Sequence, residues 1–593
     1  MTSVPIRPRF STRPVAWLRG RFRSSEAWFI ALAIGIGTVA GLLAVAQSTL
    51  AHGLQVMLFG LNIDVRLSAA DAISPWRLAW LPVGGLLLGG LGKLLGRFRT
   101  HPVVDVVEAN ALHGGSMSLR GSLLICVQTL ISNGFGASVG LEAAYAQAGG
   151  GFASALGSRL RLRRNDLRTL VGAGAGAAIG AAFGAPLTGA FYAFEVVIGS
   201  YAPSMIAPVA AATLAAVLAA QGLGSAPYSI NVAVFHSPDA VDFILYAGLG
   251  GLCAALSIAL MQAVAGGERL VRRLPIPAWL RTAAGGGVLA LLAFLSPQTL
   301  SSGHGALHAD LASGVTLKLL LLVLALKAAA SIVSLASGFR GGLFFASLFL
   351  GSLVGQIYAR LATLAAIPIV LQPENAALVG MGAFATAVVG GPLTMSFLVL
   401  ETTRDFGVAA ATLAASLVAS SIVRERFGYS FSTWRLHLRG ETIRSARDVG
   451  WVRALTAGRM MRTDVPTLSA SATLAEFRRR FPLGSATRVI LVDEAQRYAG
   501  IVVTASAYAD ALEEDHGVGA LAVNQDVTLT PDMNIAQVMQ IFETTETEDL
   551  PVVDAEGQVL GLLAEVYVAR RYAKELETVQ QGLFGESWGR RAR

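Results

Sequence analysis

The sequence predicts an all-α polytopic membrane domain followed by a soluble α/β tail. Of its 593 residues, 54% are hydrophobic and 14% are charged, whereas soluble proteins carry about 25% charged residues. Apolar runs long enough to span a bilayer recur from about residue 29 to about residue 424. Near Gly440 the composition changes, and charged clusters typical of a soluble surface follow. We therefore expect the tail to begin soon after residue 440.

The apolar segments are of two kinds. Continuous runs at 28–50, 78–95, 241–265 and 317–335 predict spanning helices. Others, such as 171–184, are short and broken by glycine, and the 65 glycines of the chain indicate close helix packing and helices interrupted at depth. Since no small-residue cleavage site follows the first run, we expect it to be a retained helix.

Basic residues cluster beside the apolar segments. Residues 1–25 hold six arginines and no acid, and Arg159-Leu-Arg-Leu-Arg-Arg164 forms a second cluster. The positive-inside rule predicts that both clusters, and both chain termini, are cytoplasmic in a bacterial inner membrane. The net charge of +8 therefore does not indicate a nucleic-acid partner. Cys126 and Cys253 lie in apolar segments and are interpreted as core residues, not as a disulfide or metal pair.

The membrane part contains a duplication. Gly184-Ala-Pro-Leu-Thr-Gly-Ala-Phe-Tyr-Ala-Phe-Glu195 recurs as Gly390-Gly-Pro-Leu-Thr-Met-Ser-Phe-Leu-Val-Leu-Glu401. Upstream of each copy lies a glycine-bounded segment, at 140–149 and at 341–351. Interrupted segments at corresponding positions of two halves indicate a site at the interface of the repeats.

Each glycine-bounded segment predicts a helix that begins inside the membrane. The first N–H groups of such a helix lack partners and carry a partial positive charge, and a preceding glycine lets an anion approach them. The alternative is that these glycines serve helix packing alone. Glu142 lies in the first segment, where a carboxylate among apolar residues indicates an ion or proton path. Its own alternative is a solvated glutamate at the membrane boundary.

The tail contains a tandem repeat of roughly 60 residues, in which a helical segment precedes two strands joined by a polar turn. The predicted helices span 473–481 and 534–542, and the predicted strands span 488–493, 498–503, 549–554 and 559–563.

The order of these motifs resembles the CLC family of chloride channels and proton-coupled chloride exchangers, from about residue 25 to residue 575. Gly140-Leu-Glu-Ala-Ala144 stands where the family has G-R-E-G-P, and Gly342-Leu-Phe-Phe-Ala346 stands where it has G-x-F-x-P. Gln147 with Gly149-Gly150 matches V-Q-x-G-G, and the two Pro-Leu-Thr segments match A-P-L-[AT]. The tail resembles a pair of CBS domains.

This resemblance implies an inverted-repeat CLC architecture, a homodimer with one pore per subunit, and chloride or another small anion as the transported ligand. It implies that Glu142 is the gating glutamate. The anion donors implied by the resemblance are the amides of Leu141, Glu142, Leu343, Phe344 and Phe345. The implied boundaries are a basic N-terminus at 1–25, a membrane domain at 26–440 with repeats at about 26–225 and 239–440, a linker at 441–454, CBS domains at 455–515 and 520–575, and a tail at 576–593.

Two further anion contacts are implied, one at a departure from the family and one at a match to it. Thr100-His-Pro-Val-Val104 stands where the family has G-S-G-I-P, so His101 replaces a serine, and the Pro102 nitrogen cannot donate a hydrogen bond. The alternative is a remodelled loop with His101 in cytosolic water. Tyr429 matches the inner tyrosine of the family, with Ser432 as a weaker candidate for the same hydroxyl, and the alternative is an interfacial aromatic.

The inner proton acceptor of coupled family members corresponds to Val196, which cannot relay a proton. We therefore interpret the chain as a passive, voltage- or pH-gated chloride channel, with proton/chloride or proton/fluoride antiport as the alternative. Glu195 is interpreted as structural, paired with a basic residue.

Other classes fit the sequence less well. An intramembrane enzyme would need a nucleophile–base pair or a metal motif, and the chain has eight scattered histidines and no His-Glu-x-x-His motif. A magnesium transporter with CBS domains would need several pore acids. Neither CBS copy keeps the aspartate that holds a ribose, so we expect a structural or dimerising tail without a bound nucleotide or other cofactor.

Overall fold

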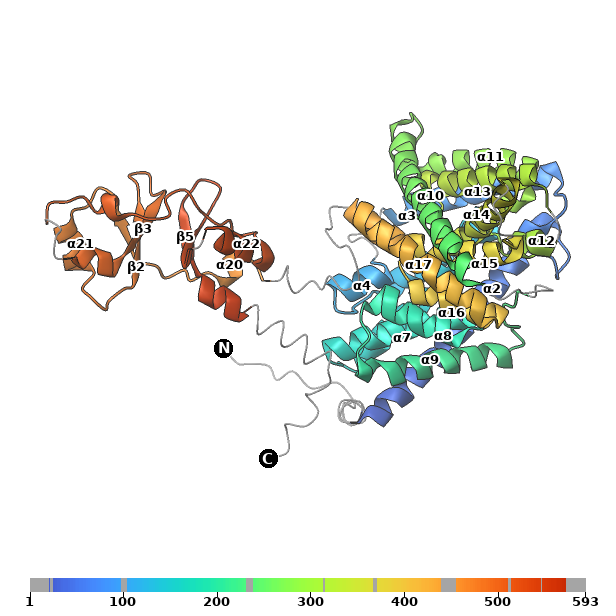
Figure 1. The fold of residues 1–593 in the computed structure, drawn as a ribbon, viewed down its shortest axis with the longest axis horizontal. Coiled ribbons are helices and arrows are strands. Elements are labelled where there is room, and N and C mark those ends of the chain that lie inside the picture. The colour runs from blue at the N-terminus through green and yellow to red at the C-terminus, as the bar shows by residue number, and fades with distance from the viewer. Residues whose placement is uncertain are drawn as a thin grey trace, which may run out of the picture. The chain divides into compact units, whose positions relative to one another are not determined.

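The chain forms two compact units, Met1–Asp448 and Val449–Arg593 (Figure 1). The computed structural model describes residues 21, 25–96, 104–230, 238–312, 315–365, 371–438, 455–509, 514–545 and 547–571. His101, most of the basic N-terminus, the predicted linker and the predicted tail at 576–593 lie outside these residues.

The described part of the first unit is helical throughout. Its first half contains α2 (Glu26–Phe59), η1 (Leu67–Ala69), η2 (Pro75–Ala79), α3 (Trp80–Gly96), α4 (Val106–Leu112), α5 (Leu119–Gly134), α6 (Glu142–Arg159), α7 (Arg164–Phe183), α8 (Pro186–Tyr192), the π-helical turn η3 (Ala193–Ile198) and α9 (Pro203–Gly222). Its second half contains α10 (Ala240–Arg273), α11 (Ala278–Leu295), η4 (Pro297–Thr299), α12 (His304–Ala312), α13 (Leu317–Ser337), α14 (Phe344–Leu364), α15 (Pro373–Val389), α16 (Pro392–Thr403), α17 (Phe406–Arg426) and α18 (Phe431–His437).

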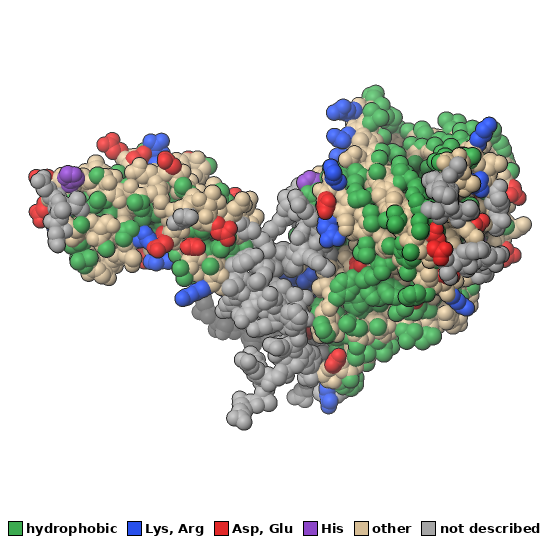
Figure 2. All heavy atoms as spheres, viewed as in Figure 1, with side chains coloured by type: hydrophobic (Ala, Val, Ile, Leu, Met, Phe, Trp, Pro, Cys, Tyr) green, Lys and Arg blue, Asp and Glu red, His purple; other side chains and the backbone are tan. Residues whose placement is uncertain are grey.

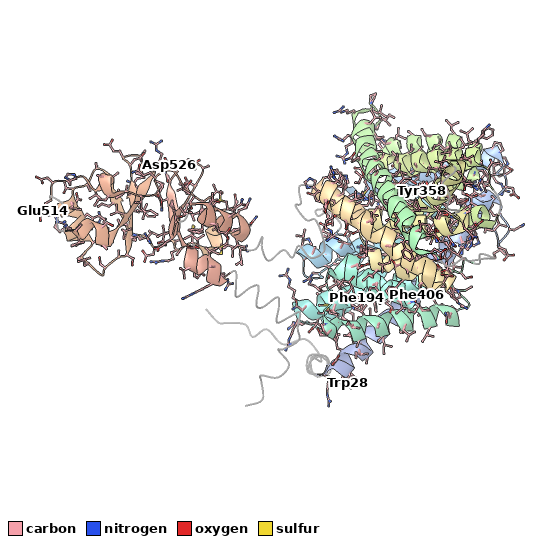
Figure 3. All side chains as sticks on the ribbon, viewed as in Figure 1. Trp28, Phe194, Tyr358, Phe406, Glu514 and Asp526 are labelled. Atoms are coloured by element: carbon pink, nitrogen blue, oxygen red, sulfur yellow. The ribbon has the colours of Figure 1, made fainter. Side chains whose placement is uncertain are left out.

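Seven helical segments of the described residues are long and apolar enough to cross a membrane, which confirms the polytopic prediction. They are Glu26–Phe59, Pro203–Gly222, Ala240–Arg273, Ala278–Leu295, Leu317–Ser337, Phe344–Leu364 and Phe406–His437. Apolar side chains cover much of the face of this unit drawn in Figure 2. Trp28 and Phe406, labelled in Figure 3, belong to this exposed apolar surface.

Both halves contain a close crossing of two helices at a pair of glycines, at corresponding positions of the repeat. In the first half, a Cβ atom on Gly149 of α6 would lie 2.1 Å from the carbonyl oxygen of Gly174 in α7. In the second half, a Cβ atom on Gly351 of α14 would lie 2.3 Å from the carbonyl oxygen of Gly380 in α15. Glycine is therefore required where these backbones cross, as in other closely packed membrane helices.

The prediction that segment 171–184 is broken by glycine was wrong. This segment belongs to α7, an unbroken helix of 20 residues that ends at Gly184 with φ 66°. The interior glycines of α7 allow close contact with neighbouring backbone, as Gly174 does with α6. Glycine interrupts the chain at the end of α7 and, in the second half, at Gly390, where α15 ends with φ 89°.

Replacing Gly174 by valine is expected to destabilise the membrane unit. An added Cβ would lie 2.5 Å from the carbonyl oxygen of Gly149, so α6 and α7 would have to separate. Overpacking of this kind costs about 3 kcal/mol, and we expect a lower thermal unfolding midpoint in detergent. Gly35→Val is the control, because Gly35 of α2 is exposed and has no heavy atom within 4 Å of an added Cβ. Equal loss in both variants would contradict this packing argument.

The tail contains two small α/β copies, as predicted. The first copy pairs β1 with β2 in parallel and β2 with β3 antiparallel, and the second pairs β4 with β5 antiparallel. The elements are α20 (Ala457–Met460), β1 (Thr467–Ser469), α21 (Leu474–Arg480), β2 (Arg488–Val492), β3 (Tyr498–Val503), η5 (Thr504–Tyr508), η6 (Val518–Leu521), α22 (Ile535–Thr545), β4 (Asp549–Val553) and β5 (Val559–Ala564).

Contacts between the two copies join the starts of corresponding strands. Arg488 of β2 forms ion pairs with Glu548 and Asp549 at the start of β4. The segment that begins the first copy packs on the second, because Ala457 lies in the core of the second copy and its N–H donates to the Met533 carbonyl oxygen at 2.8 Å. The tail is therefore one module in which the start of the first copy completes the core of the second.

Candidate functional site

The two predicted helix starts meet. Gly140 and Gly342 pair through their backbones: the N–H of Gly140 donates to the carbonyl oxygen of Gly342 at 3.0 Å, and the return bond is 3.4 Å long. Helix α6 begins two residues after Gly140 at Glu142, and α14 begins two residues after Gly342 at Phe344. Residues about 200 positions apart in the sequence thus place two helix N-termini side by side.

The amides at these helix starts lack partners. The first helical hydrogen bond of each helix is formed one turn later. The N–H of Tyr145 donates to the carbonyl oxygen of Leu141, and the N–H of Ser347 donates to that of Leu343. Within the described chain, no group accepts a hydrogen bond from the five predicted donor amides. These are the N–H groups of Leu141, Glu142, Leu343, Phe344 and Phe345, all of which belong to buried residues. Unpaired donors at two helix N-termini form an environment suited to an anion.

Glu142 places its carboxylate beside these donors. The residue is 2% exposed, and neither carboxylate oxygen has a hydrogen-bond partner among the described residues. The side chain folds back over Gly140, where an added Cβ would lie 1.8 Å from Oε2. The backbone N–H groups of Glu142 and Phe345 lie close to the carboxylate but outside hydrogen-bonding geometry. The glutamate is therefore buried and close to amides of both helix starts, without the solvation that a boundary glutamate would have.

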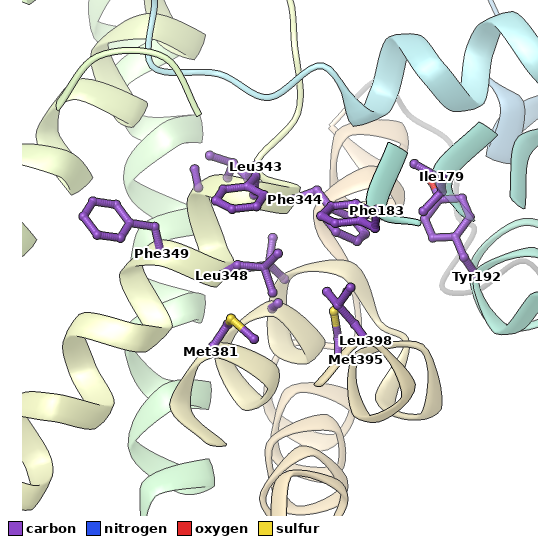
Figure 4. Close-up of a cluster of buried hydrophobic side chains, with 14 of the residues drawn as sticks. Ile179, Phe183, Tyr192, Leu343, Phe344, Leu348, Phe349, Met381, Met395 and Leu398 are labelled. Atoms are coloured by element: carbon purple, nitrogen blue, oxygen red, sulfur yellow. The ribbon is translucent and has the colours of Figure 1, made fainter. Parts of the chain in front are cut away.

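Aromatic side chains surround the start of α14. Phe344 faces Phe183 at the end of α7, with ring centroids 5.6 Å apart, and lies 6.1 Å from the ring of Tyr192 (Figure 4). The ring of Phe345 stacks on His304 of α12 at 3.4 Å. Aromatic rings from α7, α8 and α12 thus pack against the start of α14.

The glutamates that end the duplicated motif cap each other's halves. Glu195 accepts hydrogen bonds from the N–H groups of Leu393 and Thr394, at 3.1 and 2.8 Å, in the first turn of α16. Glu401 accepts from the N–H groups of Leu187 and Thr188, at 2.9 and 2.8 Å, in the first turn of α8. The hydroxyl of each threonine donates to the same glutamate at 2.7 Å.

This exchange corrects the interpretation of Glu195. It is structural, but its partners are backbone and threonine donors of the opposite half, not a basic residue. A carboxylate at a helix N-terminus needs no cation, because the unpaired N–H groups supply the positive end of a dipole. The equal spacing of the glutamate in the two copies of the motif indicated a shared structural role. It does not show which half of the chain supplies the partner.

Comparison with known proteins agrees with this geometry. The family model described as Voltage gated chloride channel matches residues 84–424, which is more than half of the chain. The chain belongs to the CLC family. A model of the CBS domain matches residues 518–574, in the second copy of the tail.

Curated relatives of this CLC chain match its membrane unit. A protein of Ralstonia nicotianae described as putative chloride channel protein ClcB-like is 29% identical over 427 residues, which cover 67% of this chain and 97% of the relative. A protein of Salmonella dublin described as voltage-gated ClC-type chloride channel ClcB is 28% identical, with 66% and 95% covered.

Solved structures confirm the CLC fold. A slow cyanobacterial Cl−/H+ antiporter superposes with a TM-score of 0.61 at 21% identity, covering 69% of this chain and 97% of that one. A eukaryotic CLC transporter gives 0.57 at 18% identity and covers 93% of this chain and 98% of that one. A CLC-type fluoride/proton antiporter gives 0.54 at 21% identity, with 67% and 96% covered.

The structure does not bring Tyr429 or Ser432, the candidates for the inner anion contact, next to Glu142. Tyr429 lines a second cavity of about 420 Å³ that Glu195 also lines, whereas Glu142 lines another. Its hydroxyl forms a hydrogen bond of 3.2 Å with Nδ1 of His437. Ser432, within α18, is half-buried and is not among the residues that line either cavity. The anion contact of Tyr429 stays a prediction.

Val196, which the resemblance assigns to the inner proton acceptor position, belongs to η3. It is half-buried and packs against the apolar core. Its side chain has no group that binds a proton, so any proton path through this unit would need another residue. His101 lies outside the described residues, and its role stays a prediction.

Proposed function

We propose that this CLC protein carries chloride, or another small monovalent anion, across a membrane between the starts of α6 and α14, with Glu142 as the gate. The observation that carries the proposal is the juxtaposition of unpaired amides and an unpaired carboxylate at the paired glycines. A carboxylate is an anion tethered to the protein. Donors suited to it also suit a free halide, so the two compete for the same space.

The proposed mode is passive flux with a voltage- or pH-dependent gate. Val196 supports this mode, since valine at the inner position leaves Glu142 without a partner that takes up protons. The second candidate is proton/chloride or proton/fluoride antiport. It is favoured by the two similar folds described as Cl−/H+ and fluoride/proton antiporters, and it would require a different inner proton route.

The reversal potential of the purified, reconstituted protein separates these modes. Vesicles are given a chloride gradient and a pH gradient together, and the voltage at zero net current is measured. Passive flux predicts the chloride equilibrium potential at every pH gradient. A potential that shifts with the pH gradient would show coupling and would overturn the channel mode. Repeating the measurement with fluoride tests the fluoride alternative.

The membrane, the orientation and the oligomeric state of the protein are also proposals. We place it in a bacterial inner membrane with both termini cytoplasmic, because basic clusters lie beside the first apolar run and before α7. A homodimer with a pore in each subunit is proposed from the family.

The CBS pair is proposed to act structurally, without nucleotide. Support comes from Thr504-Ala-Ser506 and Glu565-Val-Tyr567, which lack the aspartate expected after the corresponding strand. We expect ATP, ADP and AMP to leave the unfolding midpoint of the tail in the full chain unchanged. A nucleotide at about 100 times its Kd would add about 2.7 kcal/mol of stability. A concentration-dependent rise of the midpoint with any of the three would refute this expectation, and guanosine nucleotides serve as the comparison.

A further inference from the structure

The cavity that borders Glu142 is lined by more basic than acidic side chains. Its volume is about 310 Å³. Among the described residues that line it, the one acid is Glu142, whereas the basic side chains are Arg66, His52, His304 and His308. Charges of one sign in a cleft with low-dielectric walls raise the local concentration of ions of the opposite sign.

Arg66 is held at this cavity by the packing of its backbone. It precedes η1, in which Ser68 accepts hydrogen bonds from the N–H groups of Gly305 and Ala306, at 3.0 and 3.2 Å, near the start of α12. An added Cβ on Gly305 would lie 2.8 Å from Cβ of Arg66, so glycine permits this close approach. The Arg66 side chain is exposed, and its guanidinium makes no hydrogen bond or ion pair with any described residue.

Arg66 is the permanent positive charge of the cavity. Helix α12 is not one of the spanning helices, and burial lowers the pKa of its His304 well below the ordinary value, with a smaller contribution from Arg66. Burial also lowers the pKa of His308. Burial therefore favours the neutral form of both rings. An arginine, in contrast, stays charged throughout the physiological range.

A buried donor without a partner belongs to Tyr228, which lines the same cavity. The hydroxyl of Tyr228 is buried and forms no hydrogen bond among the described residues. Its ring packs on His304 and His308, with centroids 5.8 and 4.8 Å away. A buried hydroxyl that lacks a partner costs about 1–3 kcal/mol, and an anion in the cavity would supply an acceptor. Because His304 stacks on Phe345, this part of the cavity borders the start of α14.

We propose that Arg66 and the Tyr228 hydroxyl form an outer binding site for a small monovalent anion, separate from the amides at the helix starts. The inference rests on the proposed function. The site concentrates anions in the cavity that leads to Glu142. Its occupancy depends on Coulomb attraction to an exposed charge, so the contribution of Arg66 weakens as salt shortens the Debye length, which is about 10 Å at 0.1 M.

The first test measures chloride flux from vesicles that contain the full chain. In Arg66→Gln, we expect the half-saturating chloride concentration to rise about threefold or more at low ionic strength, with an unchanged maximal rate. Sodium gluconate is then used to raise the ionic strength, and the difference from wild type should shrink. Arg66→Lys should keep most of the wild-type behaviour, and Tyr228→Phe should raise the half-saturating concentration without removing the salt dependence.

Lys318→Gln is the matched control. Lys318 is exposed in the first turn of α13, shortly after α12, and does not line the cavity. An equal shift in Arg66→Gln and Lys318→Gln would overturn the site, as would an unchanged half-saturating concentration in Arg66→Gln. Absence of anion flux in the wild type is a different result, since it refutes the proposed function itself.

A second test restores charge in a folded protein. Arg66→Cys is reconstituted and treated with a methanethiosulfonate reagent that carries either a quaternary ammonium or a sulfonate. Cys126 and Cys253 are buried, so the introduced thiol is the accessible one among the described residues. The ammonium should lower the half-saturating chloride concentration and the sulfonate should raise it. Equal effects of the two reagents would overturn the role of charge at this position.

Discussion

Replacing Glu142 by glutamine is expected to give a high anion flux that no longer depends on pH. In the wild type, protonation neutralises the carboxylate and ends its competition with the free anion, so flux should rise as the pH falls. Glutamine cannot ionise and mimics the protonated state at every pH. A tethered group competes at an effective concentration of about millimolar or higher, so we expect the flux at alkaline pH to increase about tenfold.

The structure indicates that this substitution leaves the fold intact. Neither oxygen of Glu142 accepts a hydrogen bond within geometric limits, so exchanging one oxygen for an amide group removes no protein contact of this kind. Glu142→Ala should show the same loss of pH dependence, and its smaller side chain should leave the helix starts open.

Glu374→Gln provides the matched control for the pH measurement. Glu374 is a half-buried acid in the first turn of α15, and it does not line the cavity that contains Glu142. Flux in this variant should retain the wild-type pH profile. If Glu142→Gln also retained that profile, another group would set the pH dependence and Glu142 would not be the gate.

The helix starts were predictable because their signal is local. Glycine-bounded segments at matching places of a duplication predict two N-termini, and the pairing of Gly140 with Gly342 brings them together. The same residue type misled the interpretation of 171–184. Glycine permits both a break and a close backbone crossing, and the sequence does not specify whether another helix, here α6 at Gly149, lies opposite.

The outer cavity had no local signal in the sequence. Arg66, Tyr228 and His304 are far apart along the chain. Arg66 and Tyr228 belong to connections between helices and His304 begins the short helix α12, where composition carries little information about partners. Their juxtaposition depends on how η1 packs on α12. The glutamate exchange was missed for a similar reason, since hydrogen bonds between residues about 200 positions apart depend on tertiary structure.

Removing the exchanged caps is expected to weaken the association of the two halves. Glu195 and Glu401 each accept three hydrogen bonds, two from backbone N–H groups and one from a threonine hydroxyl. Hydrogen bonds to charged groups contribute about 1.5–3 kcal/mol. Glutamine keeps one carbonyl oxygen but turns an amide donor toward other donors, so we expect each Glu→Gln change to cost about 2–4 kcal/mol. The measurement is the thermal unfolding midpoint of the membrane unit in detergent.

Three comparisons make the cap argument specific. Thr188→Val removes one donor to Glu401, and Thr394→Val removes one donor to Glu195. Each should lower the midpoint less than replacing the glutamate that accepts this hydrogen bond. Glu268→Gln disrupts a surface ion pair with Arg272, which should leave the midpoint nearly unchanged. The double variant Glu195→Gln/Glu401→Gln should lose about the sum of the single losses, because the two caps share no hydrogen bond.

The caps should also be separable from transport. Neither Glu195 nor Glu401 lines the cavity at Glu142, so protein that remains folded after one cap is removed should keep the chloride flux and pH profile of the wild type. Glu195 does line the second cavity with Tyr429. A Glu195→Gln variant with a normal midpoint but altered coupling of protons to chloride would therefore contradict the structural role, and would identify Glu195 as the inner proton acceptor that Val196 cannot be.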